Sequence, residues 1–195
     1  YRIPDSEDIL AVKGVYTLAD GKEHTTTASF YENKLVIEGY NDMEEHEVQL
    51  YAVNRAQEES DPVKVSFRPL ESSLSKITKT ITIVSDFGGA QFNWKNEDKA
   101  PVTMEFLAQD SVGLMQVMKI ITTQSDSSRQ SLRGYAPEPR VFAAIVRDNF
   151  GNASDTVYPS ERTITPLFEE KLNKRNMNVM KLANDASFTN WEGMD

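Results

Sequence analysis

The chain contains one strand–turn–strand pattern twice, and this repeat limits the possible folds more than any other feature. EVQLYAVNRAQEESDPV, residues 47–63, matches VFAAIVRDNFGNASDTV, residues 141–157. In both copies an alternating apolar run ends in a polar loop, and a Ser-Asp pair opens the next run. Alternation with a period of two residues is typical of strands that bury one face. The repeat therefore predicts two copies of one β unit.

Further landmarks recur in the same order. VKGVYTLADG, residues 12–21, matches VTMEFLAQDSVG, residues 102–113, because each is a strand followed by a polar turn with glycine. Tyr40 at the end of LVIEGY likewise matches Tyr135 at the end of SLRGY. Landmarks that keep their order at a nearly constant offset indicate duplicated domains, and a sandwich domain needs about 100 residues.

Each copy closes on a Pro-Leu pair, at residues 69–70 and again at residues 166–167. We therefore expect the two domains to superpose, with Val53 near Val146 and the two Pro-Leu pairs in matching places. The boundary between them should fall in the polar stretch LESSLSK that begins at Leu70.

Short β-branched or aromatic runs bounded by turn residues fill both copies, so the prediction is an all-β fold with antiparallel strands and no helix in either repeat. The expected strands include KLVIEGY, HEVQLYAV, VKVSF, KTITIVSDF, AQFNW, VTMEFLA and FAAIV.

The first domain is expected to be N-terminally incomplete. Residues 1–3 align with residues 94–96, yet the second copy has a whole strand, at residues 80–87, and most of another before that point. We therefore expect the parent protein to supply those strands upstream of Tyr1.

The two polar loops of the repeat differ in composition. Asn149 to Asn152 supply the Asn and Gly residues that favour a tight reversal, whereas the first copy has Gln57 to Glu59 and is expected to form a looser hairpin. Asp148, Asn152 and Asp155 also offer oxygen ligands for calcium. Their spacing matches no known calcium signature, so turn chemistry is favoured.

Charge and composition exclude several classes of function. The formal net charge is −9, and residues 1–70 alone carry 14 acidic against 7 basic side chains. No basic stripe is present that could displace counterions from phosphates, so nucleic acid is excluded as a partner. The chain has no cysteine, which removes disulfides, thiolate catalysis and Cys-type metal sites.

No motif in the sequence carries a reaction. His24 and His46 are the only histidines, and neither has a second histidine at ligand spacing, so both are interpreted as solvated strand or loop residues. Acidic pairs such as Glu97-Asp98 lie in predicted turns, where exposure to solvent keeps the pKa of a carboxylate near its ordinary value. The sequence therefore predicts no catalytic residue, no metal site and no cofactor.

Trp and Tyr side chains can serve as stacking platforms for sugars. Trp94 alternates with Phe92 in one strand and is assigned to the core, and the equivalent Tyr40 and Tyr135 are assigned a shared structural role. Trp191 lies in SFTNWEG outside both repeats. It is the candidate ligand-binding residue, although a structural role is favoured for it too.

The repeated segments resemble those of known protein families. AVNRAQEESDPVKV resembles the hairpin between strands F and G of fibronectin type III domains, and the lack of a Cys…Trp…Cys framework agrees with that family rather than with disulfide-pinned immunoglobulins. VKGVYTLADGKE, EHEVQLYAVNR, GGAQFNWKNEDKAPV and RGYAPEPRVFAAIVRDNFGNASDT resemble a group of Bacteroidetes cell-surface lipoproteins. The resemblance implies two tandem fibronectin type III/immunoglobulin-like antiparallel β-sandwiches, at residues 1–70 and 71–167.

Those lipoproteins carry a discoidin-like, galactose-binding-type domain after the two fibronectin-like domains, and they are typically encoded near polysaccharide-utilisation genes. The resemblance implies that residues 168–195 lead into such a domain. It also implies a non-catalytic, outer-membrane-anchored surface module whose glycan partner binds the C-terminal domain, with a lipid anchor outside these residues. Two alternatives stay open: accessory domains of a glycan-degrading enzyme whose catalytic part lies elsewhere, and protein–protein adhesion through exposed strand edges.

Overall fold

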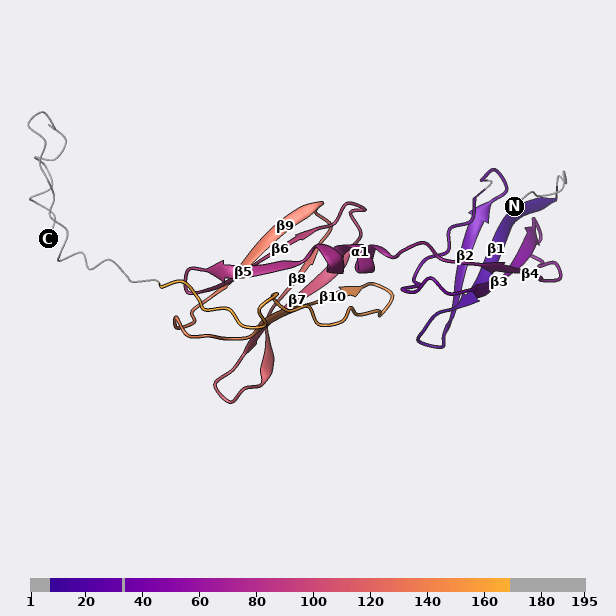
Figure 1. Cartoon of the computed structure of the whole chain (residues 1–195). Coiled ribbons are helices and arrows are strands. Elements are labelled where there is room, and N and C mark those ends of the chain that lie inside the picture. Colours follow the sequence, from indigo (N-terminus) through magenta and orange to yellow (C-terminus); the bar gives the residue numbers. More distant parts are fainter. Residues whose placement is uncertain (1–7, 33, 169–195) are drawn as a thin grey trace, which may run out of the picture.

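The computed structural model describes residues 8–32 and 34–168. Two β units follow one another along the chain, and a short helix lies where they meet (Figure 1). Every pairing between the strands is antiparallel, which confirms the all-β fold. In this part of the chain no helix is long and apolar enough to cross a membrane.

The first unit is one four-stranded sheet in the order β2-β1-β3-β4. Its strands are β1 (Ile9–Thr17), β2 (Glu23–Ser29), β3 (His46–Asn54) and β4 (Val63–Phe67). The predicted strand KLVIEGY is instead an irregular segment at residues 34–40. Ile37 from this segment packs on a small core formed by Tyr16, Leu18 and Val48.

The second unit is a sandwich of two three-stranded sheets, ordered β10-β7-β8 and β5-β6-β9. Its strands are β5 (Thr82–Asp86), β6 (Gly89–Lys95), β7 (Val102–Gln109), β8 (Met115–Thr123), β9 (Ser127–Arg133) and β10 (Phe142–Asp148). Sixteen buried residues contributed by both sheets and the helix form one core. At its centre the Phe106 ring lies 4.9 Å from the ring of Phe92 and 5.8 Å from that of Trp94. Trp94 is therefore a core residue, as the alternation predicted.

The helix α1 (Ser73–Thr80) contradicts the expectation that neither repeat would contain a helix. It lies in the polar stretch assigned to the boundary, and it takes up the beginning of the predicted strand KTITIVSDF. Ser72 caps it by accepting a hydrogen bond from the Ser75 amide at 3.0 Å. Leu74 and Ile77, three residues apart, are buried on one face of the helix, and that helical spacing was hidden among the neighbouring Ser and Lys residues.

The repeated Ser-Asp pairs make the same hydrogen bonds in both units. The Ser60 amide donates to the Ala52 carbonyl and the Ser60 hydroxyl accepts from the Ala52 amide, at 2.9 and 3.0 Å. Ser154 makes the same two bonds to Val146, at 2.8 and 3.0 Å. Because these patterns coincide, Val146 corresponds to Ala52. The sequence alignment that placed Val146 against Val53 was one residue out of register.

Other details of the repeat also differ from expectation. Leu70 is 89% exposed in the linker, whereas Leu167 is 46% exposed and pairs with Phe87, so the two Pro-Leu pairs do not occupy matching environments. In the first hairpin the Asn54 amide donates a hydrogen bond to the Glu58 carbonyl. In the second hairpin the Asp148 amide donates in the same way to the Asn152 carbonyl. The first hairpin is therefore no looser than the second.

Replacement of Phe106 by Ala should destabilise the second unit by about 3–5 kcal/mol, because it opens a cavity between Phe92 and Trp94 in a fully buried site. Urea unfolding followed by Trp94 fluorescence in a Trp191→Phe background measures this loss. Val84→Ala, at an exposed position of β5, is the control and should stay within about 0.5 kcal/mol of the parent. A loss below about 1 kcal/mol for Phe106→Ala would contradict the described core.

Candidate functional site

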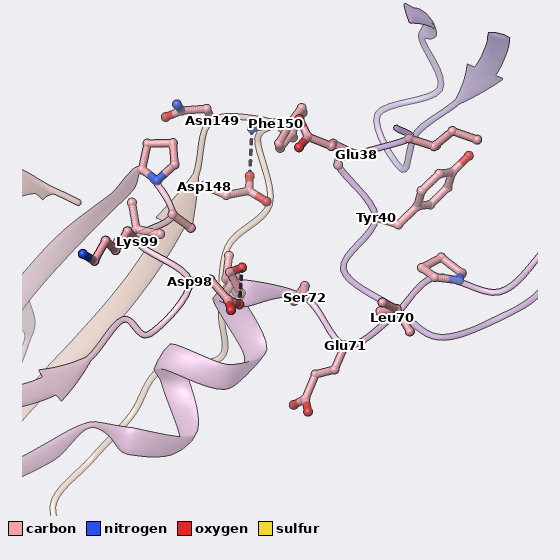
Figure 2. A pocket seen from close by; sticks show the side chains of 18 of the residues that line it. Glu38, Tyr40, Leu70, Glu71, Ser72, Asp98, Lys99, Asp148, Asn149 and Phe150 are labelled. Atoms are coloured by element: carbon pink, nitrogen blue, oxygen red, sulfur yellow. Dashed lines mark hydrogen bonds between the residues drawn. The ribbon is translucent and has the colours of Figure 1, made fainter. Parts of the chain in front are cut away.

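A cleft of about 880 Å³ lies where the two units meet, and it is here called the junction cleft. Figure 2 shows it from close by, with the first unit, the linker and two loops of the second unit contributing side chains. The lining residues come from residues 35–40, 67–74, 98–102 and 148–150. A concave site between domains is the usual place for a binding site, so this cleft is the candidate for function.

One wall of the junction cleft is the turn that follows β10. The Asp148 carboxylate accepts the backbone amides of Phe150 and Asn152, each at 2.9 Å, and the Asn152 side-chain amide at 2.7 Å. A side chain that closes its own loop in this way fixes the turn without using tertiary contacts. The carboxylate of Asp148 is therefore occupied with the turn.

This turn docks on the first unit. The Asn152 side-chain amide donates to the Gly39 carbonyl at 2.8 Å, across 113 positions of sequence. A Cβ built on Gly39 would lie 2.6 Å from Leu18 Cδ1 and 3.0 Å from Phe150 Cδ1, so only glycine allows Phe150 to approach so closely. Gly39 also has a φ of +103°, which side chains rarely adopt. The two units thus meet through a contact that requires glycine.

The linker forms a second connection. Ser72, which caps α1, also donates from its hydroxyl to the Asn41 side-chain oxygen of the first unit. The orientation of α1 is thereby tied to the first unit as well as to the core of the second. With the Asn152–Gly39 bond, this gives two hydrogen bonds on separate segments at the junction, and both restrict rotation of one unit against the other.

Lysines of α1 hold two carboxylates beside the cleft. Lys76 lies 2.8 Å from Asp98, which also accepts from the Ser73 hydroxyl, and Lys79 pairs with Glu71, which accepts from the Ser75 hydroxyl. The pKa of Asp98 is lowered by its hydrogen bond from Lys76 and then by that from Ser73. Lys79 lowers the pKa of Glu71 in the same way.

These carboxylates are unsuited to acid catalysis. A glycosidase needs one carboxylic acid whose pKa is raised, so that it still carries its proton near neutral pH. Asp98 and Glu71 are shifted in the opposite direction and are ionised there. Within the described ranges no group of three or more His, Asp or Glu residues could hold a metal ion.

Tyr40 reaches into the first unit from the edge of the cleft. Its hydroxyl donates to the Thr17 carbonyl at 3.0 Å, and its ring lies 4.1 Å from that of His46. His46 in turn bonds Asp42 through Nε2 at 2.6 Å, which lowers the pKa of Asp42. In the second unit Arg140 lies over the Tyr135 ring at 5.1 Å, so a cationic or imidazole group covers the repeated tyrosine in both copies. The structure therefore gives the two tyrosines similar supporting contacts.

The junction cleft brings together residues that the sequence reasoning did not select as a site. Trp191, the candidate from the sequence, lies outside the described residues. The sequence assigns Gly39 to the strand KLVIEGY, and it favours a turn for Phe150 and Asn152. Their long-range contact could be anticipated only from the knowledge that Asn152 and Gly39 belong to the facing ends of two consecutive units.

Replacement of Gly39 by Ala should loosen the junction, because the added Cβ meets Leu18 and Phe150. Spin labels at Thr25→Cys and Lys119→Cys, in a chain with no native cysteine, report the distance between the units. The parent should give one narrow distance distribution and Gly39→Ala a clearly broader one.

Gly134→Ala is the matched control for this experiment. Gly134 has a φ of +99°, and no described atom lies within 4 Å of a Cβ built on it, so this variant shares the backbone strain without the steric contact. It should keep the narrow distribution. Equal broadening in both variants would show that backbone strain, rather than the Gly39–Phe150 approach, governs the junction.

Replacement of Lys76 by Met should raise the pKa of Asp98 toward its ordinary value of 3.8, because the principal stabilising partner of the carboxylate is lost. The pKa of Asp98 is lower in the folded than in the unfolded protein. The stabilisation from this pair is therefore fully present above the unfolded pKa, and it is lost as the pH falls through the folded pKa. Side-chain carbon chemical shifts recorded against pH measure the change. Asp110, whose pKa is lowered mainly by the Leu114 amide, should titrate unchanged. An unmoved Asp98 would contradict the ion pair.

Two family models match this chain, and each is described as a domain of unknown function. Residues 1–69 match a domain of unknown function (DUF4959), and residues 70–175 match a second domain of unknown function (DUF5126). No curated protein matches the chain. Among solved structures, a SusE-like protein is similar at 24% identity with a TM-score of 0.43, over 52% of this chain and 34% of that protein. This chain thus spans about a third of the length of that protein. Because the second match covers more than half of the 195 residues, the chain belongs to the family described as domain of unknown function (DUF5126).

Proposed function

We propose that this chain is a non-catalytic module of an extracytoplasmic glycan-binding protein and acts mainly as a spacer that presents a C-terminal carbohydrate-binding domain. The observation that carries the proposal is the junction, where the Asn152–Gly39 bond and the Phe150 contact join two units end to end. A spacer needs a fixed connection of this kind, because a flexible one would let the distal domain fold back.

The path of the chain suits this role. Figure 1 places the start of β1 and the end of the described second unit at opposite ends of the molecule, with α1 near the middle. A domain that follows residue 168 would therefore begin far from the first unit. The resemblance to lipoproteins with a terminal discoidin-like domain supports this reading, and it implies an outer-membrane lipid anchor outside this chain.

The electrostatics of the junction cleft support a non-catalytic role. Its two lysine-paired carboxylates, Glu71 and Asp98, have lowered pKa values and are poor proton donors near neutral pH. Asp148 is occupied with backbone amides of its own turn. Glu71, Asp98 and Asp148 are therefore poorly suited to donate the proton that cleavage of a glycosidic bond needs.

Protein–protein adhesion is the second candidate, and one observation favours it. β8 lies at the edge of its sheet and exposes the apolar side chains of Val117, Met118 and Ile120. An exposed apolar edge strand can pair with a strand of another protein. The surface-spacer role and this adhesion role are compatible, because no residue of β8 lines the junction cleft.

Titration of this chain and of the whole protein against a panel of plant and host polysaccharides tests the spacer role. The whole protein is expected to bind one of them, and this chain at least roughly tenfold more weakly, a difference of about 1.4 kcal/mol. Equal affinity of the chain and the whole protein would refute the spacer role. Release of reducing ends by this chain would refute the non-catalytic role.

A further inference from the structure

The face of the first sheet that carries Val48 is here called its inner face, and part of it is apolar and exposed to solvent. Val65 lies opposite Val48 and Val63 opposite Leu50 in the β3–β4 ladder, and residues opposite one another share a face of the sheet. Val48 is buried, whereas Val63 is 62% exposed and Val65 is 39% exposed. The face is therefore covered beside Val48 and left open along β4.

The second unit contains the same positions in a covered state. Because the Ser60 and Ser154 hydrogen bonds coincide, Leu50 corresponds to Ala144 and Val63 to Val157, and the bridge between Ala144 and Val157 repeats the pairing of Leu50 with Val63. Ala144 is fully buried, and Val157 packs against the core. The same face is thus built twice along one chain and is closed in only one copy.

The segment from α1 to β6 covers this face in the second unit. Leu74 and Ile77 of α1 are 3% and 1% exposed, and α1 contacts both β10 and β6. Phe92 and Trp94 of β6 add aromatic rings over Phe106. In the second unit this face is therefore covered by a helix followed by a β-hairpin, both with apolar residues on the side that faces the sheet.

We propose that the inner face along β3 and β4, marked by Val63 and Val65, is the docking surface for a helix-and-hairpin segment of the same kind, supplied by the residues that precede Tyr1 in the whole protein. In the second unit six residues separate β6 from β7, so the covering segment directly precedes the first strand of its partner sheet. The same spacing counted back from Ile9 places such a segment almost entirely ahead of Tyr1.

A second copy of this chain is a less suitable occupant. Residues 1–70 carry 14 acidic and 7 basic side chains, so two first units brought face to face would repel one another. A covering segment in the same chain also closes with a short loop, which costs less entropy than association of separate molecules. Both arguments favour cover from within the chain.

The test uses thiol labelling, because the chain has no cysteine of its own. Val65→Cys places a thiol on the proposed docking surface, and Val84→Cys places one at a similarly exposed position, 47%, of β5. Maleimide labelling rates are measured in the 195-residue chain and in the whole protein, with any other cysteine there replaced by serine. Val63→Cys is a second probe in case Val65→Cys fails to fold, and circular dichroism checks the fold of each variant.

The thiol of Val65→Cys should react at least roughly tenfold more slowly in the whole protein than in the 195-residue chain, while that of Val84→Cys should react equally in both. Equal rates for Val65→Cys in the two proteins would overturn the proposal. Slower labelling in the 195-residue chain as its concentration rises, together with a dimer in analytical ultracentrifugation, would assign the surface to a second copy and overturn cover from within the chain. None of these labelling results depends on glycan binding, so this test is independent of the test of the spacer role.

Discussion

The hydrogen bond from the Asn152 side chain to the Gly39 carbonyl is the interaction on which the arrangement of the two units depends. It forms because the Asp148 carboxylate holds the turn closed, so that Asn152 is already oriented before it meets the first unit. On the other side, the absence of a side chain at Gly39 lets Phe150 approach. A pre-formed turn and a glycine acceptor together give a specific contact at little cost in conformational entropy. The junction cleft is the space left beside that contact.

One repeated pattern supports two cores of very different size. The second unit buries residues from two sheets and a helix, whereas the cluster of the first unit contains three buried residues. Hydrophobic stabilisation scales roughly with the apolar area removed from water, at about 25 cal/mol per Å², so the described part of the first unit is the weaker one. Its hairpin also places Gln57 at a φ of +64°, where the second copy has Gly151. The first unit thus depends on its neighbours for stability more than the second does.

The sequence predicted the features that arise from local pattern. Alternation identified β3, β4, β6, β7 and β10, and the Ser-Asp repeat identified the duplicated hairpin, because both are properties of short segments. It failed where tertiary packing overrides local composition: Ser73–Thr80 is polar on most of its surface, yet two buried residues are enough to dock it as a helix. The junction cleft was not predictable, since it depends on which turn of one unit faces which segment of the next.

The repeat also explains why the two ends of the described chain differ. Gly39-Tyr40 and Gly134-Tyr135 are equivalent, and both glycines have positive φ values, +103° and +99°. Phe150 lies against Gly39, whereas no described atom comes within 4 Å of a Cβ built on Gly134. At the other end, the turn of the first unit has Ala56 and Glu58 where the docking turn has Phe150 and Asn152. Among the described residues the docking contact therefore forms once: Gly39 has both of its partners, whereas the turn of the first unit lacks the Phe and Asn side chains that make the contact.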